Sequence, residues 1–314
     1  MPSTRETGVF TVAAVRQPRG KEAAQILLNE HQRVFTLATT GRAATALTTE
    51  LRSAARKQAP LKVVLDTRRG VIQRIVAPSA KELDEFRRNR TLLDGPERTL
   101  RIDVATIDPS VFNIVDHHLR ARIFRLCKRI VPSYKKAKEI FDFCAAQSCH
   151  LGAPAVPPCI PFQYVHDGCH ARAHQMRKII DNKYGYCVEK VFSFANQGSD
   201  TLRVRADKWG GCCVAWWFHV APFLRVRLRL RRFSIVLGMV IDPSMFNKPV
   251  LLSTWLSAQE NATCGPHAKV SMYSLQPWTA YTPANYAGTS FTTDPAYTAT
   301  NTTLNNYKNL TTCP

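Results

Sequence analysis

The sequence has no long hydrophobic run and no recognisable export signal at its start. None of its apolar stretches approaches 18 uninterrupted residues, so we expect no membrane-spanning helix and no membrane partner. Residues 1–21 carry charges and contain no apolar core of the length that a signal peptide needs. An exported protein would therefore need a start that lies outside this sequence.

Acidic residues are scarce, and the signatures of metal or nucleic-acid binding are missing. The 314 residues include 43 Lys and Arg against 23 Asp and Glu, and both halves of the chain are basic. A net charge of +20 suits an anionic partner, but no zinc finger, RNP motif or basic zipper supports nucleic-acid binding. The cysteines form no C-x2-C pair, and adjacent Cys212 and Cys213 are poorly placed to bind one metal ion. We expect no metal and no cofactor, and a nucleic-acid partner is a remote alternative.

Cysteine, in contrast, is plentiful in the second half of the chain. Seven of the ten cysteines follow residue 150, a density that is typical of an oxidising compartment. Because seven is an odd number, pairing six of them within this half would leave one free thiol. The seven are Cys159, Cys169, Cys187, Cys212, Cys213, Cys264 and Cys313.

Composition and periodicity divide the chain into four segments. Residues 1–60 are rich in Ala, Thr and Arg and specify little structure, although 21–33 has helical spacing. Residues 61–150 predict a hairpin followed by helices. Four prolines between Leu151 and Phe162 exclude a helix or a central strand. We therefore place a linker at 151–158, before a second domain at 159–314.

The second segment is predicted in more detail. The apolar runs at 61–66 and 71–78 flank the turn TRRG and predict two strands of a hairpin. Ser79, with Glu82 three residues later, predicts a capping box that begins a helix. A strand at 99–108 and helices at 110–131 and 133–148 complete the expected elements.

The stretch DGCHARAHQMRKII, residues 167–180, places a cysteine where a helix begins. A helix N-terminus lowers a thiol's pKa and offers backbone N–H groups to an oxyanion, so Cys169 is a candidate nucleophile. The alternative is a structural thiol, buried or in a disulfide. The helical spacing predicts an inward face of Ala173, Met176, Ile179 and Ile180 and an outward face of Arg172, Gln175 and Lys178.

Two further residues match what a thiol nucleophile needs. WWFHVAP places His219 inside an apolar strand, and VIDPSMF places Asp242 where the next strand ends. Alone, each has an ordinary explanation, as a core histidine and a turn-capping aspartate. In the order Cys, His, Asp they suit a nucleophile, its base and the group that orients the base. His170 and His174 flank the nucleophile, and His174 is a competing base.

The motifs around these residues resemble those of bacterial protein-glutaminases, which deamidate protein-bound glutamine. The similarity covers about 157–314, in the blocks DGCHARAHQMRKII, YGYCVEKVF, CCVAWWFHVAPFL, VIDPSMFNKPVLLSTW and the Ser/Thr/Asn/Tyr-rich C-terminus. LKVVLDTRRGVIQRIVAPSAKELDEF resembles the pro-region of their zymogens. The resemblance implies a papain/transglutaminase-like α+β domain, whose nucleophile begins a helix packed on an antiparallel sheet, preceded by a smaller α+β pro-domain.

The resemblance also implies the chemistry and the partners. Cys169 corresponds to the nucleophile, His219 to the base and Asp242 to the orienting acid. It implies an amidohydrolase, secreted or periplasmic, that acts on proteins with exposed glutamine. Its own pro-region would act as an intramolecular inhibitor, released by cleavage in or near the linker. The triad leaves a related protease or a transglutaminase as alternatives. The basic face of 225–232 is interpreted as a solvated surface rather than an anion site.

Overall fold

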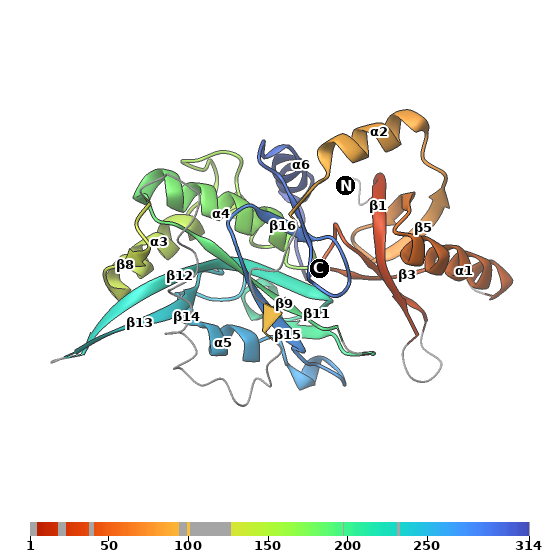
Figure 1. The fold of residues 1–314 in the computed structure, drawn as a ribbon. Helices are drawn as coiled ribbons and strands as arrows, with labels where there is room; N and C mark the ends of the chain where they lie inside the picture. The colour runs from red at the N-terminus through yellow and green to blue at the C-terminus, as the bar shows by residue number, and fades with distance from the viewer. Residues whose placement is uncertain are drawn as a thin grey trace.

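The computed structural model describes residues 5–17, 23–37, 41–93, 99–100, 127–196, 198–230 and 233–313. The chain builds an N-terminal β-barrel and a larger α+β body, which lie side by side (Figure 1). The expected α+β class is therefore confirmed. In the described part of the chain, no helix is both long and apolar enough to span a membrane.

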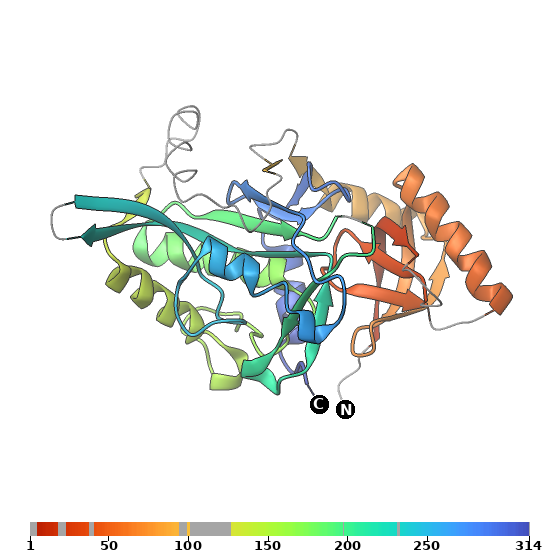
Figure 2. The same cartoon turned by 90° about the horizontal axis from the view of Figure 1, so that it is seen from below.

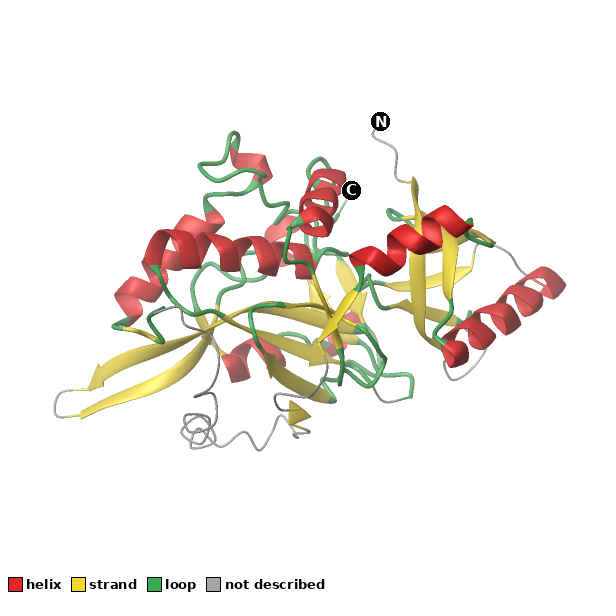
Figure 3. Cartoon of the chain, turned by 45° about the horizontal axis from the view of Figure 1, so that its top comes forward, coloured by secondary structure: helices red, strands yellow, loops and turns green. Residues whose placement is uncertain are grey.

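The barrel closes from five strands in the order β1-β2-β3-β5-β4, and helix α1 (Gly41–Lys57) packs beside β1 and adds Leu51 to the apolar core (Figure 3). Its interior is apolar and includes Val12, Phe35, Leu51 and Leu65. The strands are β1 (Arg5–Arg16), β2 (Gln25–Leu28), β3 (Val34–Leu37), β4 (Pro60–Asp66) and β5 (Val71–Val76).

The helix expected at 21–33 is wrong, because this segment contains strand β2 and a turn. Ile26 and Leu28 face the barrel interior, whereas Leu27 between them packs against the body. Three consecutive apolar residues are thus buried on the two faces of one strand. The sequence pattern does not reveal this, because a strand that is covered on both faces loses its alternation.

The hairpin and the capping box are confirmed. Strands β4 and β5 pair antiparallel, and Gly70 takes φ 70° in the turn between them. Helix α2 (Ala80–Asn89) begins after Ser79, whose hydroxyl accepts the Glu82 N–H. The Glu82 carboxylate accepts the Ser79 N–H in return, so local sequence alone sets this helix start.

The body is built on a sheet with the strand order β14-β13-β12-β9-β15-β7, and short β8 pairs with β12. Helices α3 (Tyr134–Ala145) and α4 (Cys169–Tyr184) cover one face, and α5 (Leu252–Ser257) covers the other (Figure 1). The long hairpin of β12 and β13 extends away from the barrel (Figure 2). The strands are β7 (Thr99–Leu100), β8 (Ile130–Val131), β9 (Glu189–Phe194), β12 (Phe218–Leu230), β13 (Phe233–Val240), β14 (Val250–Leu251) and β15 (Met272–Gln276).

Smaller elements complete the body. Strand β6 (Thr91–Leu93), which follows α2, joins β16 (Ala280–Pro283) and β17 (Phe291–Thr293) in a three-stranded sheet. Strands β10 (Leu202–Arg205) and β11 (Cys213–Trp216) pair with each other, and α6 (Thr298–Tyr307) packs on α4. The Thr/Asn/Tyr-rich C-terminus is thus an ordered part of the body.

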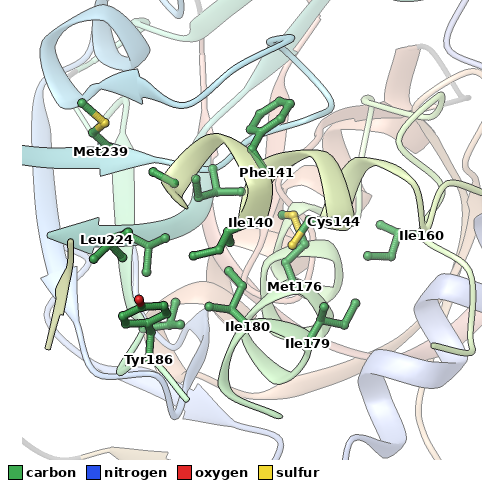
Figure 4. Close-up of a cluster of buried hydrophobic side chains, with 14 of the residues drawn as sticks. Ile140, Phe141, Cys144, Ile160, Met176, Ile179, Ile180, Tyr186, Leu224 and Met239 are labelled. Carbon is green, nitrogen blue, oxygen red and sulfur yellow. The ribbon is translucent and has the colours of Figure 1, made fainter. Parts of the chain in front are cut away.

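The proline-rich segment at 151–158 does not separate two cores. Before it, α3 contributes Ile140, Phe141 and Cys144 to the same apolar cluster as Met176 and Ile180 of α4 (Figure 4). The disulfides Cys127–Cys187 and Cys149–Cys159 also join the two sides of this segment. The structural division between barrel and body therefore lies between α2 and β6, because β6 and β7 already pair with strands of the body, and this is earlier than the composition indicated.

Four disulfides are present in the described chain, the other two being Cys212–Cys313 and Cys213–Cys264. Cys144 and Cys169 are its free cysteines, so Cys169 is the free thiol among the seven that follow residue 150. Of the strand expected at 99–108 only β7 is described. Most of the helix expected at 110–131 lies outside the described residues, and its end at Ile130–Val131 is strand β8.

Candidate active site

Cys169 is the first residue of α4, as the sequence predicts. Gly168 before it takes φ 79°, and a Cβ atom there would lie 2.9 Å from the Tyr307 ring, so only glycine fits. The Cys169 side chain is buried in the same apolar cluster as Val220, the residue after His219. The helix start and the strand that carries the candidate base are thus in direct contact.

His219 and Asp242 also meet. The His219 Nε2 atom lies 2.8 Å from Asp242 Oδ2, which fixes the ring and leaves Nδ1 on the opposite side. The imidazole is stacked between two indoles, with ring centroids 4.4 Å from Trp216 and 5.3 Å from Trp255. Asp242 accepts further hydrogen bonds from Trp255 Nε1 at 3.0 Å and from the Ser244 hydroxyl. The histidine therefore has one rotamer and one charged partner.

A glutamine of the barrel occupies the space beside Cys169 and His219. Gln32 lies in the β2–β3 loop and is fully buried. Its Oε1 atom accepts the Cys169 backbone N–H at 3.3 Å and lies 3.5 Å from His219 Nδ1. Its Nε2 donates to the Val165 carbonyl at 2.9 Å. A carboxamide thus sits with its oxygen at the helix N-terminus, where an oxyanion would be stabilised.

The backbone of Gln32 is held as firmly as its side chain. Its N–H donates to Asp167 Oδ1 at 3.1 Å, and its carbonyl accepts the Trp217 N–H at 3.0 Å. On either side, His31 pairs with the Asp167 carboxylate and Arg33 forms a β-bridge with Trp216. Contacts of three consecutive residues therefore hold the loop in the site.

Burial under this loop sets the protonation of the site. It raises the pKa of Cys169 far above its ordinary value and lowers that of His219, although the Asp242 charge opposes the second effect. Burial would raise the pKa of Asp242, but the charge of His219 and three hydrogen bonds lower it to about 2. In the covered state the thiol and the imidazole are neutral and Asp242 is ionised.

His31 and Asp167 form a second ionised group at the contact between barrel and body. Burial favours a neutral imidazole, but Asp167 and Glu6 raise the His31 pKa to about 9. Burial likewise opposes the Asp167 charge, yet His31 and the Gly168 N–H lower its pKa to about 2. Both groups are charged near neutral pH, and they join the loop to the start of α4.

The other candidates on α4 lie in different surroundings. His174 Nε2 donates to the Asp294 carbonyl at 3.1 Å, and its Nδ1 accepts from Lys190 Nζ at 2.5 Å, so both ring nitrogens are engaged. His170 packs edge-on against Tyr281. The predicted outward face of α4 is wrong at two positions, because Arg172 and Gln175 are buried. Arg172 donates to the carbonyls of Tyr164 and Asp167, which hold the turn before Cys169.

Gln32, His31 and Asp167 were not predicted as site residues. Nothing near Gln32 in the sequence marks it, and the helix expected at 21–33 would have hidden the loop. Asp167 lies two residues before the candidate nucleophile, and this proximity is a signal that could have identified it. In the described part of the chain, no group of three His, Cys, Asp or Glu residues is placed to hold a metal ion. The basic residue Arg225 pairs with Glu189.

A cysteine at a helix start, with a histidine on one strand paired to an aspartate just after the next, is the arrangement that thiol-dependent acyl-transfer enzymes use. A family model described as "Glutaminase" matches residues 137–259. Two crystal structures share the fold over nearly the whole chain. They are pro-protein-glutaminase (23% identity, 99% of this chain and 95% of that chain, TM-score 0.71) and a mutant of it (23%, 98% and 94%, TM-score 0.72).

Two structures of protein-glutaminase are similar to a shorter part of the chain. The NMR structure of protein-glutaminase from Chryseobacterium proteolyticum is 32% identical, covering 59% of this chain and 92% of that chain with a TM-score of 0.50. A crystal structure of protein-glutaminase is 30% identical with the same coverage and TM-score. No sequence among curated proteins is similar enough to count as a match. The chain belongs to the protein-glutaminase family, as its motifs predicted.

Proposed function

We propose that this protein hydrolyses the side-chain amide of protein-bound glutamine, giving glutamate and ammonia, with Cys169, His219 and Asp242 as its catalytic residues. One observation carries the proposal: a glutamine carboxamide already fits the site. The Gln32 oxygen accepts the Cys169 N–H and lies beside His219, and its nitrogen donates to Val165. The family to which the chain belongs supports the same activity.

The reaction follows from the positions of these groups. The Cys169 sulfur attacks the amide carbon while its own backbone N–H holds the oxyanion. His219, through Nδ1, protonates the departing ammonia and leaves a thioester. The same nitrogen then takes a proton from water as water attacks, releasing glutamate and restoring the thiol. Asp242, on Nε2, fixes the tautomer and stabilises the charged ring.

The barrel acts in this proposal as an inhibitory pro-region. Its β2–β3 loop fills the site, and it anchors to the body through Arg16, whose guanidinium donates to the carbonyls of Ala195 and Asp200 at 3.2 and 2.6 Å. Cleavage at 151–158 would leave its two ends joined by Cys149–Cys159. We therefore place the activating cut between α2 and residue 127. The four disulfides support an extracellular or periplasmic location.

Three reactions share the thioester step and must be separated by experiment. The chain, cleaved before residue 127, is incubated with a glutamine-bearing protein, and ammonia, peptide cleavage and amine incorporation are measured together. Ammonia release with conversion of glutamine to glutamate supports deamidation. New peptide termini would identify a protease, and an added amine joined to glutamine would identify a transglutaminase. Equal ammonia release by Cys169→Ala would overturn the proposal.

A further inference from the structure

We infer that Gln32 is a substrate of the chain's own active site, and that the intact protein deamidates it to glutamate within the same molecule. This inference rests on the proposed function and adds to it a site of self-modification. A covering loop needs only bulk and backbone contacts to exclude other substrates. Here the residue at the centre is the amino acid on which the site acts.

The contacts of Gln32 are those that turnover requires. The oxygen that would gain negative charge is the one that accepts the Cys169 N–H at 3.3 Å. The nitrogen that would leave donates to the Val165 carbonyl, which Trp216 Nε1 also contacts at 2.9 Å and so holds in place. His219 Nδ1 lies 3.5 Å from the carboxamide oxygen, so the ring that would supply the proton is beside the reacting carboxamide. Two backbone hydrogen bonds prevent the residue from withdrawing.

The self-deamidation of Gln32 needs water as its only other reactant. The sulfur of Cys169 bonds to the Gln32 side-chain carbon, and its proton passes to His219. The carbon–nitrogen bond breaks as His219 returns the proton to the nitrogen, which leaves as ammonia. Water then attacks the thioester and His219 accepts its proton. The carbon–sulfur bond breaks, and His219 passes this proton to the departing sulfur, which restores the thiol and leaves a glutamic acid side chain at position 32.

The product fits the site less well than the substrate. A carboxylate at position 32 has no hydrogen to donate to Val165, so one of its oxygens would face the carbonyl oxygen that now accepts Nε2. It would also add a negative charge to a buried site that already holds Asp167 and Asp242. Self-deamidation therefore weakens the hold of the barrel on the body. The pro-region carries a release step that only a competent active site can perform.

The neutral state of the covered site makes this reaction slow. Burial raises the pKa of Cys169, so the thiol must transfer its proton to His219 as the sulfur attacks. Gln32 is fully buried, and water reaches the thioester only when the loop moves. We expect conversion over hours of storage rather than within the time of one external turnover.

The test follows Gln32 in the intact chain. Freshly purified protein is kept in water labelled with heavy oxygen, sampled over time, digested and analysed by mass spectrometry. We expect the peptide that carries residue 32 to gain the mass of an acid in place of an amide, with one heavy oxygen. The rate should be independent of protein concentration, as an intramolecular reaction requires. Buried Gln259, which lies outside the site, serves as the internal control and should keep its amide.

Two variants decide the outcome. Cys169→Ala should keep Gln32 as an amide throughout, and equal conversion in this variant would overturn the inference. Gln32→Glu should leave the barrel fold intact, because residue 32 lies in a loop outside the barrel core. It should give the uncleaved chain activity toward an external glutamine protein well above that of fresh wild type. If it stays as inactive as wild type, the release step is wrong.

The proposed function and this inference fail differently. If the cleaved chain deamidates an external protein but Gln32 of the intact chain stays unchanged, self-modification is overturned and the function stands. If the cleaved chain releases no ammonia from any glutamine protein, the proposed function itself has failed.

Discussion

The barrel and the body of this protein are stabilised in different ways. The first 126 residues contain no cysteine, so the barrel depends on one apolar core that is closed by β1–β5. The body has four disulfides and three apolar clusters, one of which includes Ala13 and Leu27 of the barrel. The difference fits the proposal that the barrel is removed and that the body works in an oxidising compartment. From this difference we predict that substitutions in the body change catalysis and stability, whereas substitutions in the barrel change inhibition.

The largest effect should come from the nucleophile. In the cleaved chain, Cys169→Ala should lower kcat by about 10⁶-fold, as removal of a nucleophile does in comparable triads. The measurement is ammonia release from a glutamine protein. Cys144→Ala is the matched control, because Cys144 is the other free, buried thiol of the described body and lies in an apolar cluster. It should lower stability modestly and keep kcat, and a comparable loss of kcat would contradict the assignment.

The orienting carboxylate should matter less. Asp242→Asn in the cleaved chain should lower kcat by about 10⁴-fold, because the amide favours the wrong imidazole tautomer. Asp66→Asn is a contrasting change in the barrel, where Asp66 accepts the N–H groups of Arg68 and Arg69 in a turn. This variant should weaken the barrel and leave the kcat of the cleaved chain unchanged. If Asp66→Asn lowered kcat as much as Asp242→Asn does, the assignment of catalysis to the body alone would be wrong.

Disulfide removal should destabilise one region selectively. Replacing Cys213 and Cys264 by Ala together should lower the free energy of unfolding of the body by about 2–5 kcal/mol. Denaturant unfolding with and without reductant measures this effect. The barrel transition should not shift, because that region has no cysteine. A single transition that moves as a whole would mean that the two regions unfold together.

The cover should loosen on both sides of a pH window. His31 has a raised pKa of about 9, so its stabilisation of the covered state is complete below its ordinary value of 6.5 and is lost as pH rises through 9. Asp167 has a lowered pKa of about 2, so its contribution is present above 3.8 and is lost as pH falls toward 2. The activity ratio of intact to cleaved chain should therefore be smallest between about pH 4 and 6.5.

The cleaved chain measures the pH dependence of the uncovered site, and the covered site differs from it because burial shifts the pKa of Cys169 and of His219. A variant at His31 therefore isolates the contribution of this group. His31→Gln should raise the ratio within the window and flatten its rise toward pH 9. A ratio that changes equally in wild type and this variant would show that another group holds the cover.

The smallest effect should come from the end of the barrel region. Ser79→Ala removes the hydroxyl that caps α2 and should cost about 1 kcal/mol of local stability. Hydrogen exchange of the α2 amides measures the loss. Exchange in α4 should not change, since its N-cap residue, Gly168, makes no side-chain capping hydrogen bond.

Much of the body's chemistry could be predicted because it depends on local patterns. Gly168 precedes a helix whose first residue is Cys169. The apolar strand β12 carries His219, and the next apolar strand, β13, ends two residues before Asp242. The capping box of α2 is likewise encoded by four consecutive residues, from Ser79 to Glu82. The family blocks added the order of the triad. These features need only short-range periodicity and spacing.

What the sequence alone determined was the class of the body and the identity of its candidate triad, because helix starts and strand patterns are encoded locally. Only the tertiary structure decided where the two cores divide, since α3 joins α4 through packing and disulfides across the proline-rich segment. It alone brought Gln32 to Cys169, 137 residues apart in sequence. Contacts between distant segments arise from the closing of the barrel and its burial on the body, and no local pattern records them.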